Sequence, residues 1–140
     1  MLRELLSATT LSILLASQAL ASGPAASEAQ LKRGKLLFTQ CQACHQVKAG
    51  APSMMGPNLA GLMGRKAAAE PGFRYSPALK KSNLTWDAAT LDKWLHRPAA
   101  LVPGNTMAFA GMAKPEDRAA VIAWLAAETG APKKAAAAKK

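Results

Sequence analysis

Cys41 and Cys44 are the only two cysteines in this 140-residue chain, and His45 follows the second directly. A chain with only two histidines therefore places two thiols and one imidazole within five residues. Such a group has three common uses, which are a disulfide, a metal site and the attachment of a cofactor. Each use requires a different structure around this segment, so the choice among them constrains the whole fold.

The sequence around these residues favours cofactor attachment. A disulfide suits an oxidising compartment, but closing so short a loop constrains little of the unfolded chain. A thioredoxin-like redox pair is expected in a βαβ unit, and zinc would require a fourth ligand, for which only His96 is left. Cys-x-x-Cys-His is the attachment sequence of c-type haem.

The spacing of the motif has a physical reason. Residues i and i+3 of a helical turn lie on one side, so the Cys41 and Cys44 thiols can reach the two vinyl groups along one porphyrin edge. The neighbouring His45 is then directed at the iron. We therefore predict one haem c, covalently attached through Cys41 and Cys44.

Apolar residues recur at helical spacing in three segments, which predicts three main helices. The first begins at the capping box of residues 27–30 and runs towards the cysteines. The second is expected to be capped by Thr85 and to stop before Pro98. The third has Pro115 in its first turn and ends at Gly130.

The segments between these helices also point to a cofactor. A short helical turn is expected after Ser76-Pro77, and no segment alternates strongly enough to predict a strand, so the fold class is all-α. Residues 46–75 and 97–113 are rich in Gly and Pro, and irregular loops longer than about 12–15 residues are unusual in compact domains. Three modest helices also bury little apolar surface. We expect the loops to wrap around a large apolar cofactor.

The other face of the iron needs its own ligand, and a histidine–methionine pair is a known ligand set of c-type haem. A methionine ligand raises the reduction potential, because its soft thioether favours ferrous iron. Composition does not choose among the candidates, since most methionines fill cores. Met54 and Met55 follow His45 closely and are expected on its side, whereas Met107 lies in "PGNTMAFAG", a Gly/Pro-shaped loop that can fold over the other face. The candidates are Met54, Met55, Met63, Met107 and Met112.

The two ends of the chain differ from the rest. Residues 1–21 have the form of a secretory signal peptide, with a charged start at Arg3 and a small-x-small site ending at Ala21. The alternative is an uncleaved leader that tethers the protein to the membrane. Polar residues interrupt the apolar run, which argues against a membrane-spanning helix and favours cleavage. Residues 22–131 are expected to form one haem domain, and residues 132–140 an Ala/Lys-rich disordered tail.

The chain is basic, with 18 Lys and Arg against 8 Asp and Glu, which gives a net charge of +10. Arg3 and Glu4 cancel in the leader, and four lysines lie in the tail, so +6 remains for the domain. This sign favours acidic partners. The basic residues are scattered and accompany no nucleic-acid-binding motif, so we expect no nucleic-acid partner.

Six segments of the sequence occur in a familiar order along the chain: "CQACH", "GPNLAGLMGRK", "PGFRYS", "TWDAATLDKWL", "VPGNTMAFAG" and "VIAWL". Together they resemble the class I cytochromes c, of the mitochondrial type and its bacterial periplasmic relatives. The likeness covers residues 30–127 and needs no insertion or deletion from the first motif onward. It implies the cytochrome c fold, with three main helices, a short one and long loops around one haem.

The resemblance implies roles for matched positions. His45 would be the proximal iron ligand and Met107 the distal one. The carbonyl of Pro57 would accept a hydrogen bond from the His45 ring and fix its orientation. Arg65, Tyr75 and Trp86 would bind the haem propionates or brace the residues that do. The contact between the first and last helices would involve Gly34, Phe38, Val121 and Trp124.

Three positions depart from the family pattern. Trp94 stands where a tyrosine hydroxyl usually reaches the ligand sulfur, Leu79 stands where asparagine is frequent, and Asn105 replaces a threonine. We expect an intact His/Met site with a displaced reduction potential. The ring of lysines is also thinner than in mitochondrial relatives, and Lys35, Lys48, Lys93 and Lys114 remain as candidate rim charges.

The expected function is that of a soluble, monomeric periplasmic electron carrier, not an enzyme. Its expected partners are respiratory or photosynthetic membrane redox complexes, such as a quinol-oxidising cytochrome complex and a terminal oxidase, or another periplasmic redox enzyme. These partners would offer acidic docking surfaces. The alternative is a haem enzyme or gas sensor with an open iron position. A ligand role for His96, near a helix end, is not expected.

The departure at Trp94 generates a prediction. Trp94→Tyr should change the reduction potential, because it places a hydroxyl beside the ligand sulfur. Axial ligation moves haem potentials over about 0.8 V, and the change should lie well inside this range. Potentiometric titration of the purified holoprotein measures it. An unchanged potential would mean that the residue serves packing alone.

Overall fold

The computed structural model describes residues 25–130 of the chain. The predicted leader, residues 1–21, and the predicted tail, residues 132–140, lie outside the described residues. Within residues 25–130 there is no helix long and apolar enough to cross a bilayer. The same range contains helices and no strand, apart from an isolated bridge between Lys66 and Thr85, so the predicted all-α class is confirmed.

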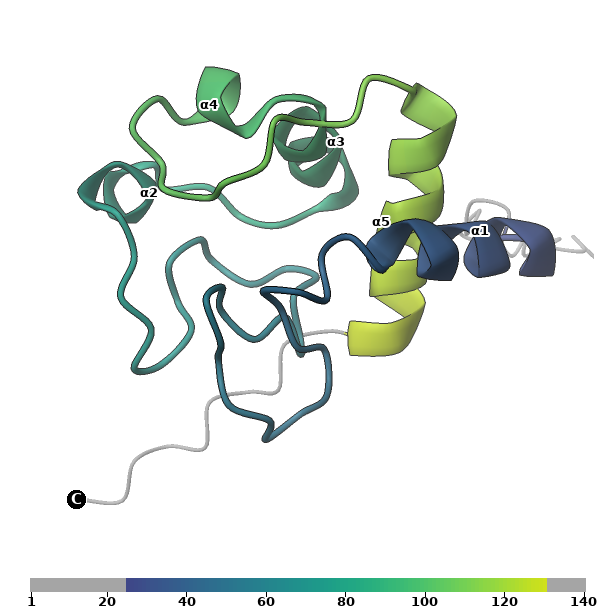
Figure 1. The fold of residues 1–140 in the computed structure, drawn as a ribbon, viewed down its shortest axis with the longest axis horizontal. Coiled ribbons are helices and arrows are strands. Elements are labelled where there is room, and N and C mark those ends of the chain that lie inside the picture. Colours follow the sequence, from purple (N-terminus) through teal and green to yellow (C-terminus); the bar gives the residue numbers. More distant parts are fainter. Residues whose placement is uncertain (1–24, 131–140) are drawn as a thin grey trace, which may run out of the picture.

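Five helices follow one another in the described part of the chain: α1 (Glu28–Phe38), α2 (Pro77–Lys81), α3 (Ala88–His96), α4 (Pro98–Leu101) and α5 (Pro115–Thr129). Figure 1 shows α1 crossing α5, with α2, α3 and α4 gathered on one side and the long loop after α1 on the other. The predicted cap at Ser27 is present, and the short helix expected after Ser76-Pro77 is α2. The side chains of Ser27 and Ser76 each accept a backbone N–H three residues on.

Two details of the helix prediction were wrong. Thr85 does not cap α3; the side chain of Asp87 does, by accepting the N–H of Thr90 at 2.7 Å. Hydrogen bonding to this N–H also lowers the pKa of Asp87. The segment 97–113 is not wholly irregular, because Pro98 starts the one-turn helix α4. A single turn is too short to show a helical period.

The contact between α1 and α5 is the main helix pairing, and α3 packs against α5 beside it. Gly34 lets the two backbones meet, because a Cβ at this position would overlap the carbonyl group of Ala120. The ring centroids of Phe38 and Trp124 lie 4.6 Å apart. Arg33 of α1 also forms an ion pair with Asp117 of α5. The end of α1, where the cysteines follow, is thereby fixed against α5.

Backbone hydrogen bonds connect the long loop to the segment that leads into α3. The N–H of Trp86 donates to the carbonyl of Arg65 at 2.9 Å, and the N–H of Gly64 donates to the carbonyl of Trp86 at 2.7 Å. Trp86 is buried, with its ring centroid 5.3 Å from that of Trp94 in α3. This pairing holds Arg65 and Trp86 side by side at the wall of the site described below.

The helix crossing generates a stability prediction. Gly34→Ala should lower the free energy of unfolding by about 1–3 kcal/mol, because the new methyl group meets the Ala120 backbone, which cannot move aside like a side chain. Chemical denaturation of the holoprotein measures the loss. The control is Lys35→Ala at the adjacent exposed position, where a change within about 0.5 kcal/mol is expected. Equal stability of the two variants would contradict the close crossing.

Candidate haem site

A cavity of about 350 Å³ lies between α1, α3, α5 and the long loops. Ligand pockets of proteins commonly enclose about 300–1,000 Å³. Its wall is mostly apolar, with Leu62, Trp94 and Val121 among the lining side chains. All eight residues predicted to bind the haem or its iron line this one cavity: Cys41, Cys44, His45, Pro57, Arg65, Tyr75, Trp86 and Met107.

The thiols and the imidazole are placed by a turn that continues from α1. The N–H groups of Cys44 and His45 both donate to the carbonyl of Cys41, at 3.0 and 2.9 Å, and the N–H of Cys41 donates to Phe38. The turn keeps both thiols at the cavity wall. Burial, together with the neighbouring Cys44, raises the pKa of the Cys41 thiol to about 11, so the unattached thiol stays protonated at neutral pH and is a weak partner for disulfide exchange.

The imidazole of His45 is held from the loop opposite. Its Nδ1 lies 2.8 Å from the carbonyl oxygen of Pro57, an arrangement that makes Nδ1 the donor and leaves Nε2 free for a metal. Burial lowers the pKa of His45, although the bond to Pro57 acts in the opposite direction. The ring is therefore neutral at pH 7, the form that binds metals.

Gly56 and Asn58, on either side of Pro57, have functions that the sequence reasoning missed. A Cβ on Gly56 would overlap the ring of His45, so only glycine at this position lets the backbone lie this close to the ring. Asn58 is 2% exposed; its Nδ2 donates to the carbonyls of Lys48 and Ala51, and its Oδ1 accepts the N–H of Ala60. The only sequence signal was their position in the "GPN" motif.

The guanidinium of Arg65 lies at another part of the cavity wall. Its Nη1 donates to the carbonyl of Ala60 and to the carboxylate of Glu70 at 2.7 Å, and its Nη2 donates to the carbonyl of Asn58. Its Nε is the one buried side-chain nitrogen or oxygen in residues 25–130 without a hydrogen-bond partner. Nearby, the Tyr75 hydroxyl accepts the N–H of Glu70, and burial raises the pKa of this hydroxyl, which keeps its proton.

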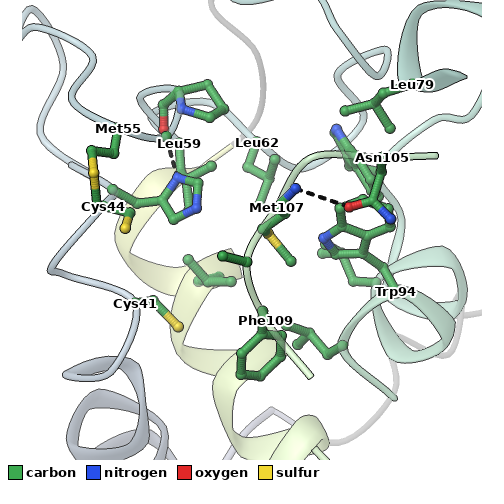
Figure 2. Close-up of a pocket in the computed structure, with 18 of the residues that line it drawn as sticks. Cys41, Cys44, Met55, Leu59, Leu62, Leu79, Trp94, Asn105, Met107 and Phe109 are labelled. Atoms are coloured by element: carbon green, nitrogen blue, oxygen red, sulfur yellow. Dashed lines mark hydrogen bonds between the residues drawn. The ribbon is translucent and has the colours of Figure 1, made fainter. Parts of the chain in front are cut away.

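Met107 enters the cavity from the loop between α4 and α5. Figure 2 shows Cys41 and Cys44 on one side of the view, Trp94 and Asn105 on the other, and Met107 between them. Met107 and Phe109 are half-buried and pack against the core. The three departures from the family pattern, Leu79, Trp94 and Asn105, all line the same cavity as Met107.

The other methionines are placed differently. Met54 and Met55 lie in the loop before Pro57; they are 46% and 79% exposed, and only Met55 touches the cavity wall. Met63 and Met112 pack against the core without lining the cavity. Among the five candidates, Met107 is thus the half-buried methionine at the cavity.

The residues of the cavity fit a c-type haem. Two thiols stand on one turn at its wall, a neutral imidazole adjoins them, and a thioether enters from a separate loop. The unpaired Arg65 Nε supplies a buried donor that a carboxylate, such as a haem propionate, can accept. Together with the Cys-x-x-Cys-His sequence, this arrangement defines a haem-attachment site.

Comparisons with known proteins agree with this class. The family model for cytochrome c matches residues 31–128. Cytochrome c2 of Rhodomicrobium vannielii is 51% identical over 98 residues, which cover 70% of this chain and 78% of that protein. Cytochrome c of Chlamydomonas reinhardtii is 46% identical over 96 residues, covering 68% and 86%.

A solved structure gives the same result. Cytochrome cH from Methylobacterium extorquens superposes with a TM-score of 0.66 at 40% identity, and the match covers 69% of this chain and 97% of that one. The chain therefore belongs to the cytochrome c family. It carries one c-type haem, covalently attached through Cys41 and Cys44.

The contact between Gly56 and His45 generates a prediction. Gly56→Ala should turn the imidazole away and weaken its bond to Pro57, with a loss of about 1–3 kcal/mol in unfolding free energy and a changed ferric Soret spectrum. Absorption spectroscopy and denaturation of the holoprotein measure both effects.

Gly50→Ala is the matched control in the same loop. Gly50 has φ +81° with no atom near a new Cβ, so this variant carries backbone strain alone, about 1–2 kcal/mol, and should keep the native spectrum. A native spectrum in Gly56→Ala would show that the ring does not depend on this glycine.

Proposed function

We propose that the protein is an electron carrier whose haem iron is bound by His45 on one side and by Met107 on the other. When bound, the haem supplies reversible one-electron chemistry at its iron. The observation that carries the proposal is that an imidazole and a thioether from separate loops line the same cavity. Two protein ligands would leave no iron position for a substrate and would keep the ligand set unchanged between oxidation states.

The surrounding side chains would serve this function in three ways. Pro57 holds the His45 ring at 2.8 Å and so fixes which nitrogen faces the cavity. The apolar walls, including Leu62 and Trp94, exclude water and disfavour the extra charge of the ferric state. Arg65, braced by Glu70, would offer its free Nε to a haem propionate.

Tyr75 and Trp86 would complete the propionate end of the site. Both line the cavity near Arg65. The Tyr75 hydroxyl keeps its proton, so it can donate to a carboxylate while it accepts from Glu70. Trp86 is joined to Arg65 by a backbone hydrogen bond, which would keep the two side chains at a constant spacing.

We further propose a location and a class of partner. The signal-like residues 1–21 and the bacterial cytochrome c2 relatives support export to the periplasm, with cleavage after Ala21. The partners would be membrane redox complexes, such as a quinol-oxidising cytochrome complex and a terminal oxidase. The candidate rim lysines Lys35, Lys48, Lys93 and Lys114 are exposed and would raise the encounter rate with acidic surfaces.

Ligand substitution tests the proposal against an open haem site. Native ferric protein should show the far-red band of a thioether bound to iron, and native ferrous protein should resist carbon monoxide. Met107→Leu should abolish the band and bind carbon monoxide readily, because leucine fills the space without a sulfur donor. Met63→Leu is the matched control, since Met63 packs on the core outside the cavity, and it should behave as native.

The same proteins, mixed with a purified quinol-oxidising complex in a stopped-flow instrument, test the carrier role. Native protein should be reduced rapidly and Met107→Leu much more slowly. Ready carbon monoxide binding by the native protein would instead support a gas sensor or haem enzyme. An identical spectrum in Met107→Leu would show that another residue is the second ligand.

A further inference from the structure

The loop that carries Met107 has a regular alternation in burial. Asn105, Met107 and Phe109 are half-buried, whereas Thr106 and Ala108 between them are exposed. The segment belongs to no helix or sheet. Its backbone N–H groups therefore need partners other than a neighbouring strand.

The side chain of Asn105 supplies such a partner. Its Oδ1 accepts the N–H of Met107 at 3.0 Å, and its Nδ2 donates to the carbonyl of Val102 at 2.9 Å. The backbone N–H of Asn105 also donates to Val102, at 3.1 Å. One amide side chain thus bridges the turn that ends α4 and the backbone of Met107. Figure 2 shows the bond to Met107.

The next fixed point of the loop lies several residues later. The N–H of Met112 donates to the carbonyl of Leu95 at 2.8 Å, and Gly111 approaches His96 so closely that a Cβ there would overlap the His96 carbonyl. Between Asn105 and Gly111, the one backbone hydrogen bond is local, from Phe109 to Met107. Asn105 is therefore the connection that ties Met107 to the rest of the fold on its N-terminal side.

We propose that Asn105 is a positioning residue that holds Met107 at the iron and limits how frequently the thioether leaves. The proposal rests on the proposed function, in which Met107 is the second ligand. The bond from Met107 N–H to Oδ1 restricts the backbone at the residue whose side chain enters the cavity. Nδ2 and Oδ1 of Asn105 each make one hydrogen bond within the loop, and the bond to the Met107 N–H is the route by which this side chain would act on the thioether.

Packing is the competing explanation. Met107 and Phe109 also contact the apolar core, and this contact alone could hold the thioether in place. Asn105→Ala removes both side-chain hydrogen bonds and leaves the two apolar side chains unchanged. Asn105→Ser restores a short hydroxyl that can accept an N–H two residues on, more weakly than asparagine.

The experiment compares these variants as holoproteins with the native chain and with Ser27→Ala. Ser27 accepts the N–H of Gln30 in a bond of the same kind at the start of α1, away from the cavity, so its loss controls for a general loss of stability. Two quantities are measured, the hydrogen-exchange rate of the Met107 amide and the rate at which carbon monoxide binds ferrous protein.

In Asn105→Ala we expect both rates to rise about fivefold or more, the size expected for the loss of one net hydrogen bond. Asn105→Ser should give intermediate rates and Ser27→Ala native ones. Unchanged rates in Asn105→Ala, or equal increases in Ser27→Ala, would overturn the proposal. If Asn105→Ala does not mature, rates in Asn105→Ser that rise above native while Ser27→Ala stays native would support the proposal, and native rates in Asn105→Ser would contradict it.

The outcome is separable from that of the proposed function. A native protein without the far-red band, or a Met107→Leu variant that keeps it, would refute the ligand assignment itself. A native band together with native rates in Asn105→Ala would refute only the role of Asn105.

Discussion

The structure depends on an apolar cavity whose wall combines residues from the first and last helices of the domain. Phe38 from α1, Leu91 from α3 and Val121 from α5 reach it, and loops provide the rest of its wall. The loops are long because they must surround a flat, apolar group rather than connect helices by the shortest path. The helices are few for the same reason, since the haem of this family supplies much of the apolar contact that further helices would otherwise provide.

Local chemistry made much of this fold predictable. Ser27 and Ser76 cap helices through bonds to residues three positions on, and Gly130 at φ +64° ends α5, so each signal and its effect lie within one turn. The Cys-x-x-Cys-His motif is equally local. The prediction that Thr85 caps α3 was wrong because two residues close together are both good N-cap residues. Asp87 forms the cap, whereas Thr85 takes part in the bridge to Lys66, a contact with a distant residue that local sequence does not show.

Other parts of the site depend on contacts between distant residues and have no local signature. Gly56 is required because the ring of His45, eleven positions earlier, lies where a side chain would stand. The unpaired Nε of Arg65 follows from the directions of its other three hydrogen bonds. Asn105 was recognised from sequence as a departure, but its bond to Met107 required the shape of the loop. Such features need coordinates, because periodicity reports only which side of an element is apolar.

The crossing of α1 and α5 has a consequence for how the two ends of the domain depend on each other. The turn that carries Cys41 and Cys44 continues directly from α1, and α1 rests on α5 through Gly34 and Phe38. The position of the two thiols is therefore set partly by a helix at the far end of the domain. A substitution in α5 on the side that faces α1 would displace the attachment turn without contacting it.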